Sequence, residues 1–202
     1  MFYYYSSFGG DGGARPFAIG SKKLGMWLFI VSDSLTFATL LMVYTYLRIA
    51  TPSWPMPFQF SPSILFATLM TFVLLSSSLT MVTAVHAMQN GDRRAAARWI
   101  FATVACGVGF ILLHAMEWFR LLKETWSEPL FGATFFTITG LHMTHVAVGA
   151  IYLSIIGGGV SRGKFTSEDV EVSGLYWHFV DLVWMFVFPL IYLMSVNGGV
   201  QG

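Results

Sequence analysis

Five long runs of apolar residues limit what this 202-residue chain can fold into. Crossing the hydrocarbon core of a membrane as a helix takes about 20 such residues. Runs of this kind occupy residues 24–47, 64–88, 99–118, 130–156 and 175–196. Lipid supplies no hydrogen bonds, so each run must satisfy its own backbone as a helix, and none shows the alternation of a barrel strand. The sequence therefore predicts an all-α integral membrane protein whose five-helix transmembrane domain spans residues 24–197.

The composition agrees with lipid as the solvent. Hydrophobic residues make up 55% of the chain and charged residues 10%, whereas soluble domains carry about 25% charged residues. A net charge of +1 leaves no basic surface for nucleic acid. The single cysteine, Cys106, excludes an internal disulfide framework and a multi-cysteine metal site, and its apolar surroundings indicate a buried thiol.

The charged segments between the runs predict an orientation. Residues 1–23 are expected to form a flexible tail, and they lack the pattern of a signal peptide. Cytoplasmic loops carry more Lys and Arg than loops on the other side. On the side of the N-terminus there would be eight basic residues: Arg15, Lys22, Lys23, Arg93, Arg94, Arg98, Arg162 and Lys164. On the opposite side there would be three: Arg48, Arg120 and Lys123. We therefore expect the N-terminus inside and the C-terminus outside.

Ionisable residues within the runs are the candidates for function, because a membrane helix tolerates them at a cost and usually turns them inward. Asp33 lies nine residues past Leu24, roughly 13 Å along a helix and near mid-membrane. One interpretation is a proton-linked or carbodiimide-reactive carboxyl. The other is a neutral acid that forms hydrogen bonds between helices.

Two histidine-containing pairs have the spacing i, i+3 and so share a helix face. His142 and His145 could hold a metal with a third ligand from elsewhere, but the glutamate and i+4 histidine of a hydrolytic zinc helix are missing. Hydrogen bonding between helices is the favoured interpretation. His178 and Asp181 could form a structural pair or, as the less favoured alternative, a proton relay.

Residues closer to the ends of the runs favour an interfacial position. This group includes His86, His114 and Glu117. Tryptophans near predicted helix ends suggest an interfacial belt, formed by Trp27, Trp54, Trp99, Trp118, Trp126 and Trp177. No nucleophile–base set, phosphate loop or closed metal motif is present in the sequence, so the chain is not expected to hold a catalytic centre.

Four segments carry the polar residues described above: GLYWHFVDLVWMFVFPLIYLM (174–194), FGATFFTITGLHMTHVAVGAIYL (131–153), GMWLFIVSDSLTFATLLMVYTYL (25–47) and GFILLHAMEWFRLL (109–122). They resemble one family, subunit III of haem-copper terminal oxidases, in its short five-helix form. By this resemblance, Asp33 takes the position of the family's intramembrane acid. The other polar family positions are matched by Glu117, His142, His145, His178 and Asp181.

The resemblance implies a noncatalytic subunit of a proton-pumping oxidase that reduces O2 in a bacterial inner membrane. Haem and copper would belong to the partner subunit I, a direct neighbour, with subunit II, a small subunit IV and a respiratory supercomplex as further partners. The chain would support proton uptake by subunit I and its stability during turnover, and it would bind phospholipid. Asp33 is shorter than the glutamate of seven-helix members, so carbodiimide reactivity need not transfer.

Three alternatives remain open at the level of sequence. The chain could be the accessory subunit of a nitric oxide reductase. It could be an independent proton or ion transporter that uses Asp33 and the histidines, although inverted repeats and broken helices are absent from the sequence. It could also be a purely structural module that holds lipid.

Overall fold

The computed structural model describes residues 20–58, 63–124 and 129–195. It contains the long helices α1 (Ser21–Ala50), α2 (Leu65–Gln89), α3 (Arg93–Glu124), α4 (Pro129–Ser161) and α5 (Ser167–Val187). All five are long and apolar enough to cross a membrane. The described ranges contain no extended strand, so the predicted five-helix membrane architecture is confirmed. The expected flexible tail, 1–23, lies outside the described residues except for its last four.

The helices extend past several of the apolar runs and end at short polar turns. Gly91 and Gly163 have φ angles of 82° and 74°, which glycine adopts without steric cost, and they form the α2–α3 and α4–α5 turns. A capping box starts α5, because Thr166 and Asp169 each accept a hydrogen bond from the other's backbone N–H. At the far end, α5 passes into the π-helical turn η2 (Phe188–Tyr192), which contains Pro189, and the 3-10 turn η3 (Leu193–Ser195).

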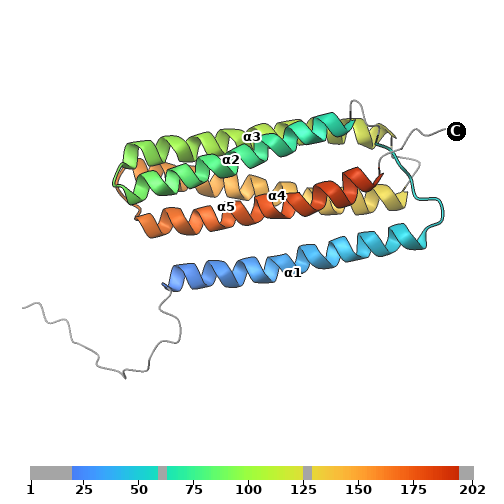
Figure 1. Cartoon of the computed structure of the whole chain (residues 1–202), viewed down its shortest axis with the longest axis horizontal. Helices are drawn as coiled ribbons and strands as arrows, with labels where there is room; N and C mark the ends of the chain where they lie inside the picture. Colours follow the sequence, from blue (N-terminus) through green and yellow to red (C-terminus); the bar gives the residue numbers. More distant parts are fainter. Residues whose placement is uncertain (1–19, 59–62, 125–128, 196–202) are drawn as a thin grey trace, which may run out of the picture.

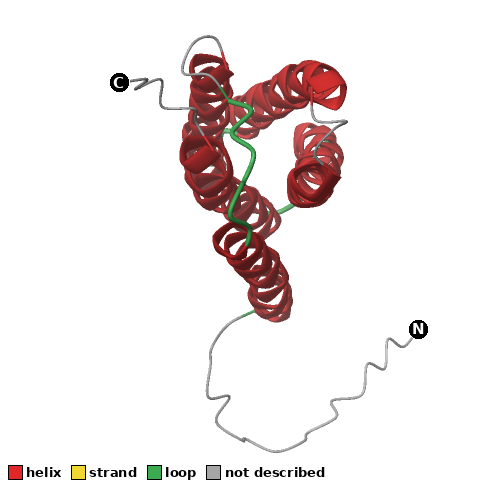
Figure 2. Ribbon diagram, turned by 90° about the vertical axis from the view of Figure 1, so that its right-hand side faces the viewer, coloured by secondary structure: helices red, strands yellow, loops and turns green. Residues whose placement is uncertain are grey.

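Four helices form a group, and α1 lies at its edge. Figure 1 shows α1 apart from α2 and α3, and the view along the bundle in Figure 2 shows the same separation. The buried residues of α1 are Ile30, Phe37 and Tyr44, which recur every seven residues and so form one narrow stripe. This helix therefore packs along a single seam, chiefly against α5.

Polar contacts hold α1 at both ends. At one end, Lys22 Nζ lies 2.6 Å from Asp169 Oδ1 and Lys23 Nζ lies 2.9 Å from Glu171 Oε2. At the other, the Tyr44 hydroxyl lies 3.0 Å from that of Ser195. Arg48 also donates a hydrogen bond to the Met194 carbonyl.

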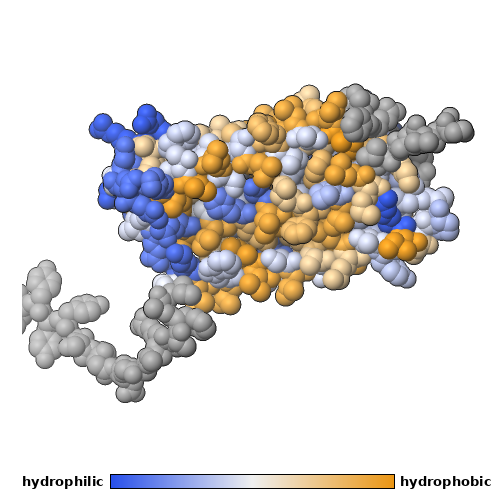
Figure 3. All heavy atoms as spheres, viewed as in Figure 1, coloured by the Kyte–Doolittle hydropathy of each residue, from blue (hydrophilic) through white to orange (hydrophobic). Residues whose placement is uncertain are grey.

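The surface is polar at the ends and apolar between them. In Figure 3 hydrophilic residues gather at the end that carries the start of α1 and the α2–α3 and α4–α5 turns. Apolar residues cover most of the central part of the same face. This distribution suits a molecule that spans a membrane. The side on which each terminus lies stays a prediction from the basic residues.

One tryptophan of the expected interfacial belt belongs to the core instead. Trp177 has no exposed surface, and its indole contacts the backbone of α3 and α4 at Gly107 and Gly149. Its position near the end of an apolar run gave the wrong expectation because α5 begins eight residues earlier than that run and turns this side chain inward. Trp126 lies outside the described residues.

Candidate functional site

Asp33 of α1 and His145 of α4 meet between the two helices. The Nε2 atom of His145 lies 3.2 Å from Oδ2 of Asp33, which is the distance of an ion pair, although Oδ2 makes no well-aligned hydrogen bond. The two side chains are 16% and 15% exposed, so the pair is mostly covered and still reachable from the surface. The ring of Phe37 stands edge-on beside that of His145, with centroids 5.3 Å apart.

The contact made by the other ring nitrogen of His145, Nδ1, determines which protons the Asp33–His145 pair can carry. Nδ1 lies 2.8 Å from the Leu141 carbonyl oxygen, one turn earlier in α4. A carbonyl only accepts hydrogen bonds, so Nδ1 must carry a proton there. Nε2 then faces Asp33 either as an acceptor from a neutral acid or as the N–H of an imidazolium beside a carboxylate. The Tyr176 hydroxyl donates to the His145 carbonyl over 3.1 Å and braces the same turn.

His142 lies in a different environment from His145, despite the spacing of three. It has no exposed surface, its ring stacks on Trp184 with centroids 5.1 Å apart, and it meets Phe110 edge-on. Neither ring nitrogen has a hydrogen-bond partner among the described residues. At His145 the ring forms a hydrogen bond within α4 and lies at ion-pair distance from Asp33 of α1, whereas aromatic rings surround His142. The hydrogen bonding between helices expected for the pair stays a prediction.

Glu117 and His114 of α3 point into the bundle and are not on its surface, whereas their expected depth near the membrane interface stays a prediction. They are 3% and 0% exposed. The Tyr192 hydroxyl of η2 donates to Glu117 Oε2 over 2.8 Å, and His114 Nδ1 lies 3.9 Å from the same oxygen. Distance along a run indicates depth but not the direction of a side chain, and α3 turns both residues toward α5 and η2. His86, by contrast, is exposed in the last turn of α2.

His178 and Asp181 do not form a direct ion pair within the described part of the chain. Both contact Ser78 of α2 instead. The Ser78 hydroxyl lies 2.5 Å from His178 Nδ1 and also forms a hydrogen bond with Asp181, whose other oxygen is buried without a partner among the described residues. The sequence did not single out Ser78, because a serine in an apolar run gives no sign of what it faces. The bridge joins α2 to α5.

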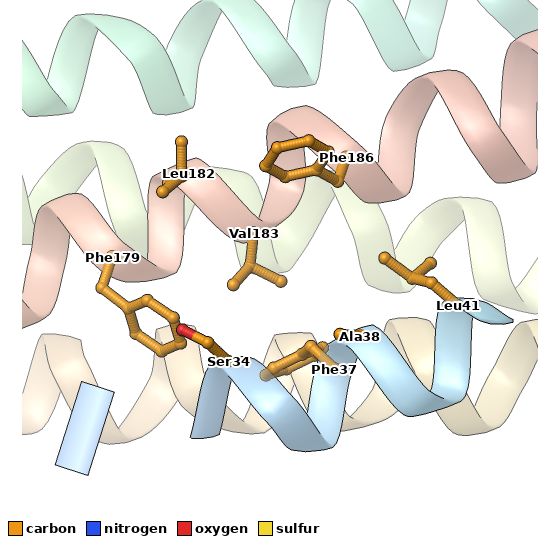
Figure 4. Close-up of a pocket in the computed structure, with 8 residues that line it drawn as sticks. All are labelled: Ser34, Phe37, Ala38, Leu41, Phe179, Leu182, Val183 and Phe186. Carbon is orange, nitrogen blue, oxygen red and sulfur yellow. The ribbon is translucent and has the colours of Figure 1, made fainter. Parts of the chain in front are cut away.

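An apolar cavity of about 230 Å³ separates the middle of α1 from α5. Figure 4 shows Phe179, Leu182, Val183 and Phe186 of α5 on one side and Phe37, Ala38 and Leu41 of α1 on the other, with Ser34 beside them. The Ser34 hydroxyl donates to the Ile30 carbonyl in its own helix. The wall therefore offers few polar partners, and the cavity suits a hydrocarbon group.

The polar residues do not converge on a metal. Within the described ranges, no three His, Cys, Asp or Glu side chains come close enough to hold an ion. The arrangement combines a facing Asp and His, a buried acid and an apolar cavity in a bundle of helices that can span a membrane, which is typical of an integral membrane protein.

Comparison with known proteins identifies the family. Residues 10–196 match the family described as Cytochrome c oxidase subunit III, and the chain belongs to it. It is 34% identical over 184 residues to Cytochrome c oxidase subunit 3 of Bacillus sp. strain PS3, covering 88% of each chain. It is 33% identical over 180 residues to Quinol oxidase subunit 3 of Bacillus subtilis strain 168, covering 87% of this chain and 88% of that one.

A mammalian relative extends the comparison. Cytochrome c oxidase subunit 3 of Hippopotamus amphibius is 35% identical over 192 residues, covering 90% of this chain and 73% of that one. The expected family is thus confirmed. The chain is a subunit III of the haem-copper oxidase family, a multi-pass membrane protein that forms part of a multi-subunit oxidase.

Proposed function

We propose that this chain supports proton uptake and sustained turnover of the catalytic subunit of a haem-copper oxidase in a bacterial inner membrane. Subunit I would be its direct neighbour and would hold the haem and copper, with subunit II and a small subunit IV in the same complex. Proton uptake would take place at the side of the basic loops. The observation that carries the proposal is the contact between Asp33 of α1 and His145 of α4, whose facing atoms lie 3.2 Å apart.

Each residue of the pair turns an atom that can carry a proton toward the other, Oδ2 of Asp33 and Nε2 of His145. With Nδ1 of His145 committed to the Leu141 carbonyl, a neutral acid beside neutral imidazole and a carboxylate beside imidazolium differ only in the position of one proton. Both forms are neutral overall, so neither leaves a net charge in the membrane. Gaining or losing a proton would create such a charge, which is costly there. The pair can therefore exchange its proton internally while keeping its net charge.

The cavity between α1 and α5 supports phospholipid binding as a second part of the role. Its walls are almost entirely apolar, and it lies between two membrane-spanning helices (Figure 4). We propose that an acyl chain fills it and maintains the spacing of α1 from the bundle. Lipid extraction followed by mass spectrometry of the purified complex tests this part, with the filled-in variant Ala38→Phe expected to retain less lipid.

Replacing Asp33 with Asn tests the main proposal. The amide cannot accept the shared proton, so we expect an assembled complex with slower proton uptake or a shorter turnover lifetime. The measurements are oxygen consumption through prolonged turnover and proton uptake followed with a pH indicator dye. Thr39→Ala is the control, because that hydroxyl is exposed and donates its hydrogen bond to the Leu35 carbonyl of its own helix. Loss of the haem-bearing subunit from the Asp33→Asn membranes would replace this role with one in assembly.

A further inference from the structure

A groove of about 380 Å³ lies between α2 and α5, two helices that pack against each other (Figure 1). Its polar lining comes from the end of the bundle where α2 ends and α5 begins, and Glu171 there accepts hydrogen bonds from Lys23 and Gln89. His86, which is exposed, and His178, which is half-buried, line the same groove. The charged and polar part of the lining gives water a path from the surface to the imidazole of His178.

A buried acid lies just beyond His178. Asp181 is one turn farther along α5 and is only 6% exposed. At a rise of about 1.5 Å per residue, His178 and Asp181 lie about 10 Å and about 15 Å farther along the helix than Glu171, the last charged side chain before them. A charged carboxyl at that distance from the polar end is costly in a membrane, and a proton on Asp181 removes the charge.

Ser78 of α2 connects these two residues of α5. Its hydroxyl lies 2.5 Å from His178 Nδ1 and forms a hydrogen bond with Asp181. The other serine and threonine hydroxyls of α2 each donate to a backbone carbonyl three or four residues earlier, namely those of Thr68, Thr71, Ser76, Ser77, Thr80 and Thr83. Ser78 is the exception among the described hydroxyls of this helix, so its proton is left for the side chains of α5.

A hydroxyl with one proton links its two neighbours in a single direction. When Asp181 is a carboxylate, Ser78 donates to it and accepts from the Nδ1–H of His178, which leaves Nε2 without a proton. When Asp181 is a neutral acid, it donates to Ser78, Ser78 donates to Nδ1, and Nε2 carries a proton. The two arrangements differ by one proton in total. A proton that binds to Nε2 from water is therefore matched by transfer from Nδ1 to Ser78 and from Ser78 to Asp181.

We propose that Asp181 is a proton-exchanging carboxyl, and that protons reach it from water in the groove through His178 and Ser78. The inference goes beyond the proposed function, because it involves neither Asp33 nor His145. That pair exchanges a proton internally and keeps its net charge, whereas this chain of hydrogen bonds takes one proton up from water and holds it on Asp181. The protonated state is neutral, which a membrane favours.

Infrared spectroscopy of the purified complex in water and in D2O tests the proposal. The C=O band of a carboxylic acid shifts when deuterium replaces its proton, and the band that Asp181→Asn lacks belongs to Asp181. We expect this band to shift several-fold more slowly in Ser78→Ala and His178→Phe than in the unaltered protein. Ser78→Thr keeps the hydroxyl and should exchange close to the unaltered rate. Ser76→Ala is the matched control, because its hydroxyl donates to the Phe72 carbonyl of its own helix.

A purely structural role of Ser78 predicts a change of the opposite sign. If Ser78 only held α2 against α5, its removal would loosen the contact and speed up exchange. Exchange in Ser78→Ala as fast as in the unaltered protein, or faster, would therefore overturn the proposal, as would the lack of any carboxylic-acid band assigned to Asp181. The spectra are recorded without turnover, so failure here leaves the result for Asp33→Asn, and with it the proposed function, unaffected.

Discussion

The indole N–H of Trp177 donates a hydrogen bond to the Ser77 hydroxyl over 2.9 Å, between residues 100 positions apart in the chain. Ser77 is the middle one of three consecutive serines in α2, each with a different role. The Ser76 hydroxyl donates to the Phe72 carbonyl of its own helix, and Ser78 joins His178 and Asp181. Ser77 and Ser78 therefore connect α2 to α5, whereas Ser76 bonds only within α2 and can serve as a control position for substitutions at the other two.

Ser77→Ala should destabilise the bundle. The variant leaves the buried indole N–H of Trp177 without its acceptor, which should cost about 1–3 kcal/mol. The measurement is thermal unfolding of the purified complex in mild detergent, monitored by the amount of this chain that stays in solution. Ser76→Ala should have almost no effect. Equal melting temperatures for the two variants would show that the indole finds another partner.

Ser78→Ala should weaken the contact between α2 and α5. It removes a hydrogen bond from both His178 and Asp181, so a loss of about 1–3 kcal/mol is expected for the unpaired groups. A double-mutant cycle with His178→Ala, measured by the same unfolding assay, isolates the coupling. If the two effects simply add, the 2.5 Å contact contributes nothing of its own.

Gly107→Ala should be destabilising and Gly109→Ala should not. A Cβ at Gly107 would lie 2.5 Å from the Trp177 ring, whereas nothing lies within 4 Å of one at Gly109. Overpacking a core position costs about 1–3 kcal/mol, and alanine favours a helix over glycine by up to about 1 kcal/mol. We therefore expect opposite shifts of the melting temperature. A stabilised Gly107→Ala protein would mean that Trp177 has room to move.

Tyr192→Phe should be more harmful than Glu117→Gln. The first change removes the only hydroxyl that donates to Glu117 Oε2 among the described contacts, and an unsatisfied buried partner costs about 1–3 kcal/mol. The amide of the second change still offers an oxygen to Tyr192. Protease resistance of the solubilised complex at rising temperature compares them. Equal protease resistance of the two variants would indicate that the buried Glu117 carboxyl is stabilised mainly by its other neighbours, such as Arg120.

The sequence predicted the architecture well because a membrane imposes its own length scale. A helix needs about 20 apolar residues to cross it, and each of the five runs is that long. Helix ends were less certain, since a capping box such as Thr166 with Asp169 extends α5 into polar sequence that hydropathy excludes. The orientation of the termini depends on basic residues alone and remains a prediction.

The candidate site was only partly accessible from sequence. Asp33 and His145 were each singled out, but their contact joins residues 112 positions apart, and no local pattern encodes the rotation of two helices about their axes. The same limit left the direction of the Glu117 side chain open. Ser78 was missed because serine and threonine hydroxyls in apolar helices often bond to their own backbone, as Thr71 and Ser76 do. Tyr192 was missed because its partner, Glu117, lies 75 positions away in the chain.

The packing of α1 chiefly on α5 has a consequence for how the chain is made. A ribosome delivers α1 first and α5 last, so about 115 residues separate the synthesis of the two partners. At 5–20 residues per second, α1 waits on the order of 10 s before its seam can form. Asp33 lacks His145 until α4 has been made, and α1 lacks its main packing partner until α5 follows. The first helix must therefore stay in the membrane without its main packing partner until the last helix has been made.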